Sequence, residues 1–370
     1  MNSLKIIKIS IVLSLHLSAC LIARAQSKLN PKEVFVLSGH GGEVQALAFN
    51  PRGQVLCSGG GEGDAIWWNF AAILDSVKKG SVVLSGSTSA YEVQRKHVAE
   101  RISAISCNKL EVLAISGVTH WGNGFGSSLE VYTQFQPEPL TFGGNAAWSF
   151  TSVDIHSQSA YILMGGNNNE LKAVSLLQKL DNKGKVVPNR ITKIAPNIPD
   201  QVWRVAIHPR ESLVVAAGRN GWIKYYSVSP IGLDPKVVAN DPSHQNRAGI
   251  VGLKFSRDGR SLLSLDSSGE LHVSNIFDGE TKQQYNGLGK LPGWLDIHPT
   301  ESWALIPSMD GSCRIIDIST GAKLAEFAHH EGGANVAVFA PDGCFVATGG
   351  KDHKIRIWDL GIQQPKKSRR

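Results

Sequence analysis

The chain has 370 residues, of which 42% are hydrophobic and 19% charged, with 38 glycines and a formal net charge of +7. The two ends carry seven basic residues and no acidic ones: Lys5, Lys8, Arg24, Lys366, Lys367, Arg369 and Arg370. Subtracting these seven from the 38 lysines and arginines leaves 31 basic against 31 acidic residues. The body of the chain therefore lacks the basic surplus expected of a nucleic-acid-binding protein, and no nucleic-acid partner is expected.

Residues 1–25 have the pattern of an export signal. A basic leader precedes an apolar run, and Ala23-Arg24-Ala25 is a small-x-small cleavage pattern. Two alternatives stay open: Leu17 to Cys20 resembles the lipobox of bacterial lipoproteins, in which Cys20 would be lipidated, and the segment could also remain as an uncleaved anchor. We therefore expect an exported protein, periplasmic or extracellular, or a lipoprotein tethered to the membrane through Cys20, with a short linker over 26–32.

Beyond residue 32, short apolar runs alternate with Gly, Asn, Asp and Pro turns, which is typical of an all-β chain. In chain order, strands are expected over 33–38, 44–49, 65–69, 101–107, 109–117, 128–134, 150–155, 161–166, 170–176, 202–207, 213–218, 222–228, 250–255, 261–265, 270–276, 294–297, 303–307, 313–318, 337–339, 344–348 and 355–358. Residues 90–102 have a helical pattern, and 119–128 are expected to form a glycine-rich loop. From 30 to 360, no apolar run is long enough to span a membrane.

One unit of this pattern recurs along the chain. The residue expected to end the innermost strand of each unit recurs at steps of 42 to 58 residues: Phe49, Cys107, Ile155, Ile207, Phe255, Ile297 and Phe339. This spacing fits repeats of about 40 to 45 residues with loop insertions. Seven such positions predict seven structural units.

The last unit, residues 329–360, combines a His before a strand, a Pro-Asp-Gly turn, a strand ending in Gly-Gly and a terminal Trp358-Asp359. The first unit aligns with it without a gap, so that His40 matches His330 and Trp68 matches Trp358. This combination resembles the WD-repeat β-propeller family. The resemblance implies an all-β, seven-bladed β-propeller of four-stranded antiparallel blades over 33–360, followed by a basic disordered tail over 361–370. We expect residues 33–38 to complete the last blade as its outer strand.

The same resemblance implies a buried hydrogen-bonded set in the two best repeats, built from a His, a Ser or Thr, an acidic residue and a Trp. The two sets are His330, Thr348, Asp352 and Trp358 in the last repeat, and His40, Ser58, Glu62 and Trp68 in the first. Elsewhere the Trp position holds Tyr226, Ser274 or Ile316. These residues are expected to have structural roles, because a satisfied polar network fixes one arrangement where the ring closes.

The sequence offers no pattern for catalysis, a metal or a cofactor. His156, His208 and His298 follow the inner strands of different blades, so we interpret them as turn residues rather than zinc ligands. The repeat register places Cys107 at the opposite strand end from Cys57, and buried thiols rather than disulfides are expected at these positions and at Cys313 and Cys344. The chain is therefore not expected to be an enzyme.

The remaining candidates are aromatic residues at the surface, which often anchor partners. They are His120, Trp121 and Phe125 in the glycine-rich loop, Trp222 at the start of a third strand, and Trp203 and Trp294 at the entrances of two inner strands. Trp203 and Trp294 could instead pack between blades. These features favour a monomeric scaffold that binds another protein or peptide. The alternative is an exported enzyme or small-ligand binder that uses the central channel, with Asp154, Asp296 and Glu43 as candidates that do not share one aligned level.

Overall fold

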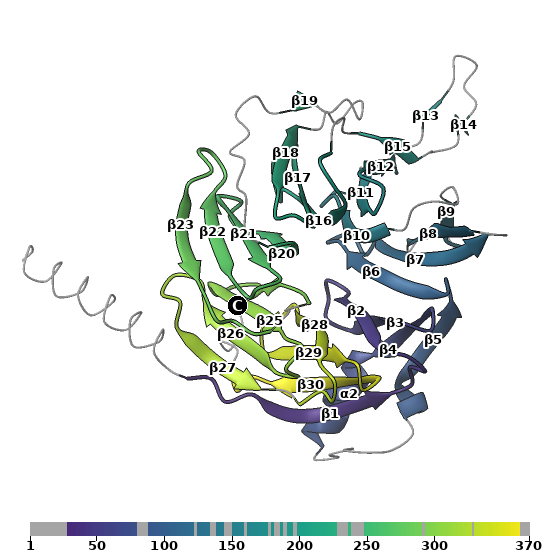
Figure 1. The fold of residues 1–370 in the computed structure, drawn as a ribbon. Coiled ribbons are helices and arrows are strands. Elements are labelled where there is room, and N and C mark those ends of the chain that lie inside the picture. The colour runs from purple at the N-terminus through teal and green to yellow at the C-terminus, as the bar shows by residue number, and fades with distance from the viewer. Residues whose placement is uncertain are drawn as a thin grey trace, which may run out of the picture.

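The computed structural model describes residues 28–79, 88–121, 124–133, 138–143, 150–158, 161–176, 179–180, 186–187, 191–194, 198–227, 236–237, 248–290, 293–327 and 329–362. Seven antiparallel four-stranded sheets are arranged around a central axis as the blades of a propeller (Figure 1). The predicted fold class is confirmed. The predicted signal at 1–25 and most of the basic tail lie outside the described residues.

The blades follow one another along the chain, and each is given from its inner to its outer strand. Blade 1 is β2 (Val44–Phe49), β3 (Val55–Gly60), β4 (Asp64–Asn69) and β5 (Glu92–His97); blade 2 is β6 (Arg101–Cys107), β7 (Leu113–Trp121), β8 (Gly124–Tyr132) and β9 (Leu140–Gly143); blade 3 is β10 (Phe150–Ile155), β11 (Tyr161–Gly166), β12 (Leu171–Ser175) and β15 (Ile191–Lys193). Blade 4 is β16 (Val202–Ile207), β17 (Leu213–Gly218), β18 (Ile223–Ser227) and β19 (Lys236–Val237); blade 5 is β20 (Ile250–Phe255), β21 (Ser261–Asp266), β22 (Leu271–Asn275) and β23 (Thr281–Tyr285). Blade 6 is β24 (Asp296–Ile297), β25 (Trp303–Pro307), β26 (Cys313–Asp317) and β27 (Lys323–Phe327); blade 7 is β28 (Ala334–Phe339), β29 (Phe345–Gly350), β30 (Lys354–Asp359) and β1 (Lys32–Ser38). A separate pair, β13 (Lys179–Leu180) and β14 (Val186–Val187), lies in an insertion of blade 3.

The repeat positions agree with the strands. Each of the seven predicted positions, Phe49, Cys107, Ile155, Ile207, Phe255, Ile297 and Phe339, is the last residue of an inner strand. Among the described residues, the buried apolar clusters each lie between two neighbouring blades, and every neighbouring pair shares one. The hydrophobic core is therefore divided into layers around the ring, because each blade buries both of its faces.

The ring is closed by the N-terminal strand. β1 pairs antiparallel with β30, so that Lys32 lies opposite Asp359 and Ser38 opposite Lys354. Figure 1 shows this first strand, in purple, beside the yellow strand near the C-terminus. Phe35 is completely buried in the cluster that blades 7 and 1 share. The prediction that residues 33–38 complete the last blade is confirmed.

Two secondary-structure predictions are wrong. Residues 90–102, predicted as helix, contain the end of the short 3-10 helix η1 (Thr88–Tyr91), then β5 and the start of β6. Much of this segment forms β5 because it pairs with the edge of β4, which would otherwise be unpaired. The helix lies earlier, as α2 (Phe70–Lys78), whose Asn69 side chain caps the N–H of Ala72.

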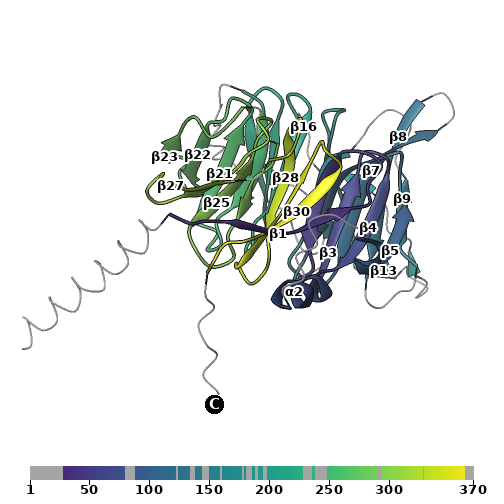
Figure 2. The same cartoon turned by 90° about the horizontal axis from the view of Figure 1, so that it is seen from below.

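The glycine-rich segment over 119–128 is also not a loop. β7 and β8 pair without interruption as far as Trp121 opposite Gly124, so the segment is a β-hairpin. Figure 2 shows β8 rising beyond the body of the ring, away from α2 on the opposite face. The side chains of residues 120–125 lie outside the described part of the structure.

Two of the predicted turn histidines form hydrogen bonds to the neighbouring blade. His208 of blade 4 contacts the Gly259 carbonyl of blade 5 through Nε2 at 3.0 Å, and His298 of blade 6 contacts the Gly343 carbonyl of blade 7 at 2.9 Å. Both glycines have positive φ, and a Cβ at either would come within 2.5 Å of the imidazole. A side chain at either turn would therefore displace the histidine from its place between the blades.

Candidate functional site

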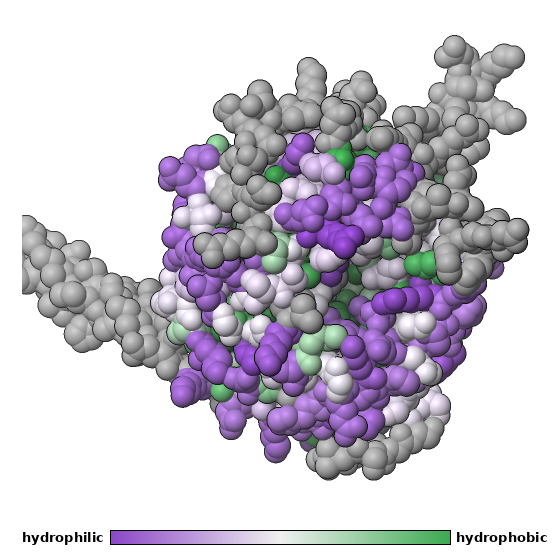
Figure 3. Space-filling model, viewed as in Figure 1, coloured by the Kyte–Doolittle hydropathy of each residue, from purple (hydrophilic) through white to green (hydrophobic). Residues whose placement is uncertain are grey.

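The inner strands begin on one face of the ring, where they surround a hollow of about 540 Å³ at the mouth of the central channel. Six of the seven blades contribute side chains to it. Figure 3 looks onto this face and shows mostly hydrophilic residues around the central hollow. This channel mouth, defined by the residues around that hollow, is the best candidate for a binding site.

A repeated irregularity of the inner strands shapes the channel mouth. In six blades the pairing of the inner strand with its neighbour shifts by one residue just after the start: at Gln45, Ser103, Thr151, Trp203, Val251 and Asn335. Such bulges turn one side chain out of the regular alternation. Four of these residues, Gln45, Ser103, Thr151 and Asn335, line the hollow.

One side of the channel mouth carries a polar network across blades 7, 1 and 2. Asn335 donates to Glu43 at 3.4 Å and to the carbonyl oxygen of Val44 at 3.2 Å. Gln45 donates to the same carboxylate at 3.0 Å and accepts from Arg101 at 3.3 Å. These bonds hold the Glu43 carboxylate in place and leave the exposed Arg101 guanidinium at the rim.

The other side is organised by Arg204. Its guanidinium donates to the carbonyl oxygens of Trp203, Val251 and Gly293, and so joins blades 4, 5 and 6. Burial lowers the pKa of Arg204 to about 10, and the group stays charged at neutral pH. It lies 5.5 Å from the centre of the Trp294 ring, within the range of a cation–π contact.

Below the channel mouth the channel narrows to a cavity of about 30 Å³, which is room for about one water molecule. Asp154 lines it, and Asp154 and Asp296 each immediately precede the last residue of their inner strand. The two aspartates therefore share one level, while Glu43 lies at the mouth, so the three candidates do not lie at one level, as the sequence predicts. Burial raises the pKa of both carboxyl groups, against the opposing charge of Lys254.

Both aspartates have a structural role, because each hydrogen-bonds to the backbone of the next blade. Asp154 accepts the backbone N–H of Ile207 at 2.9 Å, and Asp296 accepts that of Phe339 at 2.9 Å, in each case from the next blade. Each carboxylate thus joins two inner strands. These hydrogen bonds favour a structural role of the two aspartates over the catalytic role considered for the channel.

The hydrogen-bonded set of blade 7 contains the four residues named from the sequence. His330 contacts Asp352 through Nδ1 and the Thr348 hydroxyl through Nε2, both at 2.8 Å, and Trp358 Nε1 donates to the same hydroxyl at 3.0 Å. Burial alone would raise the pKa of Asp352, but the His330 contact and the Arg356 guanidinium lower it to about 2.

Blade 1 repeats this arrangement at the other side of the seam. His40 contacts Glu62 at 2.5 Å and Ser58 at 2.7 Å, and Trp68 donates to Ser58 at 2.8 Å. Burial would raise the pKa of Glu62, but the hydrogen bond and charge of His40 together with backbone N–H groups lower it. The two networks flank the junction of the first and last blades, where they restrict the packing to one arrangement.

The predicted aromatic anchors fall into three groups. His120, Trp121 and Phe125 lie in the β7–β8 hairpin, and their side chains are outside the described part of the structure. Trp222 is only 8% exposed and packs in the cluster between blades 3 and 4, so its proposed surface role is wrong. Trp203 and Trp294 are partly buried, and of the two Trp294 lines the channel mouth.

The predicted placement of Cys57 and Cys107 at opposite strand ends is also wrong. Cys57 and Cys107 line one mainly apolar pocket of about 200 Å³ between blades 1 and 2, rather than lying at opposite ends. Burial raises the pKa of Cys57, and it raises that of Cys107 to about 12. Both thiols therefore stay protonated at neutral pH, which makes them poor nucleophiles.

The sequence missed the basic residues that define the channel mouth. Arg101, Arg204 and Lys351 come from blades 2, 4 and 7 and line the same hollow. Aligning the starts of the inner strands would have placed Arg101 at the same level as Glu43. No sequence signal placed Lys351 there, because it comes from a turn between the second and third strands of its blade.

Residues 31–69 and 321–359 match the family described as WD domain, G-beta repeat. The two matched segments contain both hydrogen-bonded sets and the whole closing strand β1. These matches support the WD-repeat family. They cover the two repeats in which the sequence pattern is strongest, on either side of the ring closure.

Several curated proteins are similar to parts of this chain. Transcription factor unc-37 of Caenorhabditis elegans is 25% identical over 186 residues, which are 48% of this chain and 30% of that protein. Protein groucho of Drosophila melanogaster is 25% identical over 148 residues, 40% of this chain and 20% of that protein. Striatin-3 of Homo sapiens is 23% identical over 338 residues, 90% of this chain and 35% of that protein. The chain thus spans about a third or less of these relatives.

No helix among the described residues is long and apolar enough to cross a membrane.

Proposed function

We propose that this protein is a non-catalytic propeller scaffold that binds another protein or peptide at the channel mouth, in an exported compartment. The observation that carries the proposal is the hollow of about 540 Å³ lined by side chains of six blades. A rigid ring positions these side chains without needing the partner, which reduces the entropy cost of binding. The names of the three relatives state no enzymatic activity, which supports a non-catalytic role.

The charges around the channel mouth favour an acidic segment of the partner. Arg101, Arg204 and Lys351 line the hollow, and Glu43 is the one acidic residue among its described lining residues. The Glu43 carboxylate already accepts hydrogen bonds from Gln45 and Asn335. The excess positive charge would attract an acidic peptide and orient it over the channel.

A small polar ligand in the channel is the second candidate function. It is favoured by the charged level below the channel mouth, where the Lys254 ammonium interacts with the Asp154 and Asp296 carboxylates. The cavity at that level is only about 30 Å³, so a ligand larger than a water molecule would have to bind above it.

Charge reversal at the rim tests the scaffold proposal. The mature protein and its Arg101→Glu and Lys351→Glu variants are used to capture partners from the native host, with identification by mass spectrometry. A labelled oligoglutamate peptide, with oligolysine as comparison, measures the charge preference directly. Both variants should weaken binding at least about 10-fold, and raised salt should weaken binding to the unchanged protein.

Lys78→Glu is the matched control, since Lys78 is exposed at the end of α2 on the opposite face. It should leave capture unchanged. Partner binding that survives both rim reversals would refute the channel mouth as the contact surface. Trp121→Ala in the same assay tests the predicted contact of the β7–β8 hairpin.

Export remains part of the proposal and has its own test. N-terminal sequencing of the protein recovered from its host distinguishes a chain that begins at Gln26 from one that begins at a lipidated Cys20. Recovery of the protein with Met1 in the cytoplasmic fraction would contradict export. Sedimentation analysis of the same sample tests the expected monomer.

A further inference from the structure

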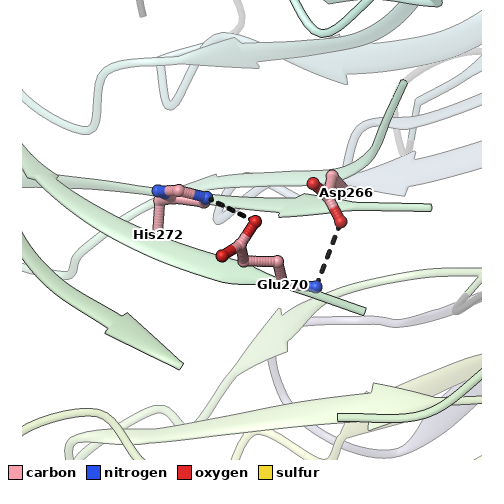
Figure 4. A group of neighbouring side chains, drawn as sticks. All are labelled: Asp266, Glu270 and His272. Carbon is pink, nitrogen blue, oxygen red and sulfur yellow. Dashed lines mark hydrogen bonds and ion pairs between the residues drawn. The ribbon is translucent and has the colours of Figure 1, made fainter. Parts of the chain in front are cut away.

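Blade 5 contains a cluster of metal-ligating side chains that the scaffold role does not use. Asp266, at the end of β21, Glu270, in the following turn, and His272, in β22, each place one potential ligand atom within 4.8 Å of the others. Figure 4 shows the three side chains grouped along the β21–β22 hairpin. The Nε2 of His272 lies 3.5 Å from Oε2 of Glu270.

Two buried polar atoms of this cluster make no hydrogen bond to the described residues, which is unusual for such atoms. Asp266 is completely buried, and its Oδ2 accepts no hydrogen bond from the described residues. The buried Nε2 of His272 likewise makes no hydrogen bond there. In Figure 4 the free oxygen of Asp266 lies on the side that faces His272. A buried carboxylate oxygen without a donor is costly, and a cation between these atoms would satisfy both of them.

Comparison with the other blades shows that this aspartate is unusual. In five blades the first residue of the inner strand pairs with the last residue of the second strand. In four of them that last residue is a glycine: Gly60, Gly166, Gly218 and Gly350. Blade 5 has Asp266 instead, opposite Ile250. The fold therefore does not require a carboxylate at this position.

The histidine is also a departure from the repeat. The strand pairing places His272 where other blades have Lys172, Lys224, Arg314, Arg356 or Ile66. In blade 3 the basic side chain forms a simple ion pair, with Lys172 and Glu170 2.7 Å apart. Blade 5 replaces the ammonium, which cannot bind a metal ion, by an imidazole, which can.

Each carboxylate is also oriented by its neighbours. Asp266 Oδ1 accepts from the N–H groups of Ser268 and Glu270 at 3.0 Å and from the Ser268 hydroxyl at 2.6 Å. Glu270 Oε1 accepts from the Gln284 amide. In both residues one oxygen is held by the protein while the other remains on the side of the cluster, as is common where outer hydrogen bonds orient metal ligands.

We propose that Asp266, Glu270 and His272 bind a divalent transition-metal ion, with Zn²⁺ as the closest chemical fit. An imidazole nitrogen with two carboxylate oxygens is a ligand set that Zn²⁺ accepts at about 2.0 to 2.2 Å. An ion equidistant from three atoms 4.8 Å apart would lie about 2.8 Å from each, so shifts of about 0.7 Å per ligand suffice. His272 and Glu270 are 14% and 15% exposed, which leaves the fourth position open to water or a partner group.

The test is titration of the tag-free protein with Zn²⁺ in a calorimeter, with Mn²⁺ and Ca²⁺ as comparison ions. One Zn²⁺ should bind per chain with micromolar affinity or better, and Ca²⁺ should bind more weakly because it prefers oxygen ligands. Asp266→Asn keeps the oxygen that caps the turn and removes the free one. His272→Lys restores the type of ion pair that blade 3 has. Each variant should weaken Zn²⁺ binding at least about 10-fold.

His97→Lys serves as the matched control. His97 and Asp64 also form a histidine–carboxylate pair, at 2.9 Å, but the histidine is 63% exposed and none of the described residues adds a third ligand to them. This variant should bind Zn²⁺ as the unchanged protein does. Absence of Zn²⁺ binding, or binding that both blade 5 substitutions leave intact in folded protein, would overturn the proposal. Circular dichroism of each variant shows whether it has folded.

Discussion

Truncation of Phe35 tests whether the closing strand stabilises the ring. The side chain is 0% exposed, packs in the cluster shared by blades 7 and 1, and meets Tyr91 edge to face at 5.0 Å between ring centres. Phe35→Ala removes a ring from a layer that the two ends of the chain build together. The expected loss in the free energy of unfolding is ~3–5 kcal/mol, the usual range for a buried phenylalanine.

The assay is thermal and urea unfolding followed by circular dichroism. For a domain of this size, the loss corresponds to a fall in Tm on the order of 5 °C. Phe35→Leu, which keeps most of the volume, should cost less than ~1.5 kcal/mol. Phe277→Ala is the control, because Phe277 is 70% exposed, and it should change stability by no more than ~0.5 kcal/mol.

A Phe35→Ala protein that unfolds like the Phe277→Ala control would refute the argument for closure. Deletion of residues 33–38 is the stronger form of the test, since it leaves β30 without its outer partner. That protein should unfold at a markedly lower temperature or fail to fold. Recovery of stability on addition of a synthetic peptide with this sequence would show that the strand itself, and not the altered chain end, is responsible.

Two further predictions concern the hydrogen-bonded set of blade 7. Thr348→Val should lower the free energy of unfolding by ~2–3 kcal/mol in urea, because it leaves the buried Nε2 of His330 and the indole N–H of Trp358 without their shared hydroxyl; an unchanged midpoint would contradict the network. The pKa of about 2 for Asp352 lies below its value in the unfolded chain, so the carboxylate adds ~2 kcal/mol of stability above about pH 4 that is lost as the pH falls toward 2. Asp352→Asn should be less stable at pH 7 and lose less stability on acidification, and parallel pH profiles for the two proteins would contradict this assignment.

The sequence by itself determined the number of blades, the inner-strand ends and the closing strand. These features follow from local patterns: apolar runs of strand length, tight turns between them and a constant offset between the first and last repeats. The hydrogen-bonded sets could be named from the resemblance to the WD-repeat family, since the matching residues recur at fixed positions within one repeat. The assignments that failed were local ambiguities, such as residues 90–102, where an available strand edge outweighed a helical pattern.

Only the tertiary structure decided which side chains meet across the ring. The bulges that turn Gln45, Thr151 and Asn335 toward the channel mouth depend on pairing with a neighbouring strand, which no local pattern encodes. Arg204 reaches carbonyl groups of two other blades, and its partner Gly293 is 89 residues away. Asp266, Glu270 and His272 are close in sequence, but the argument that they bind a metal ion depends on the burial of Asp266. Because burial and cross-blade contact come from packing seven units in a closed ring, they are properties of the whole fold rather than of any one repeat.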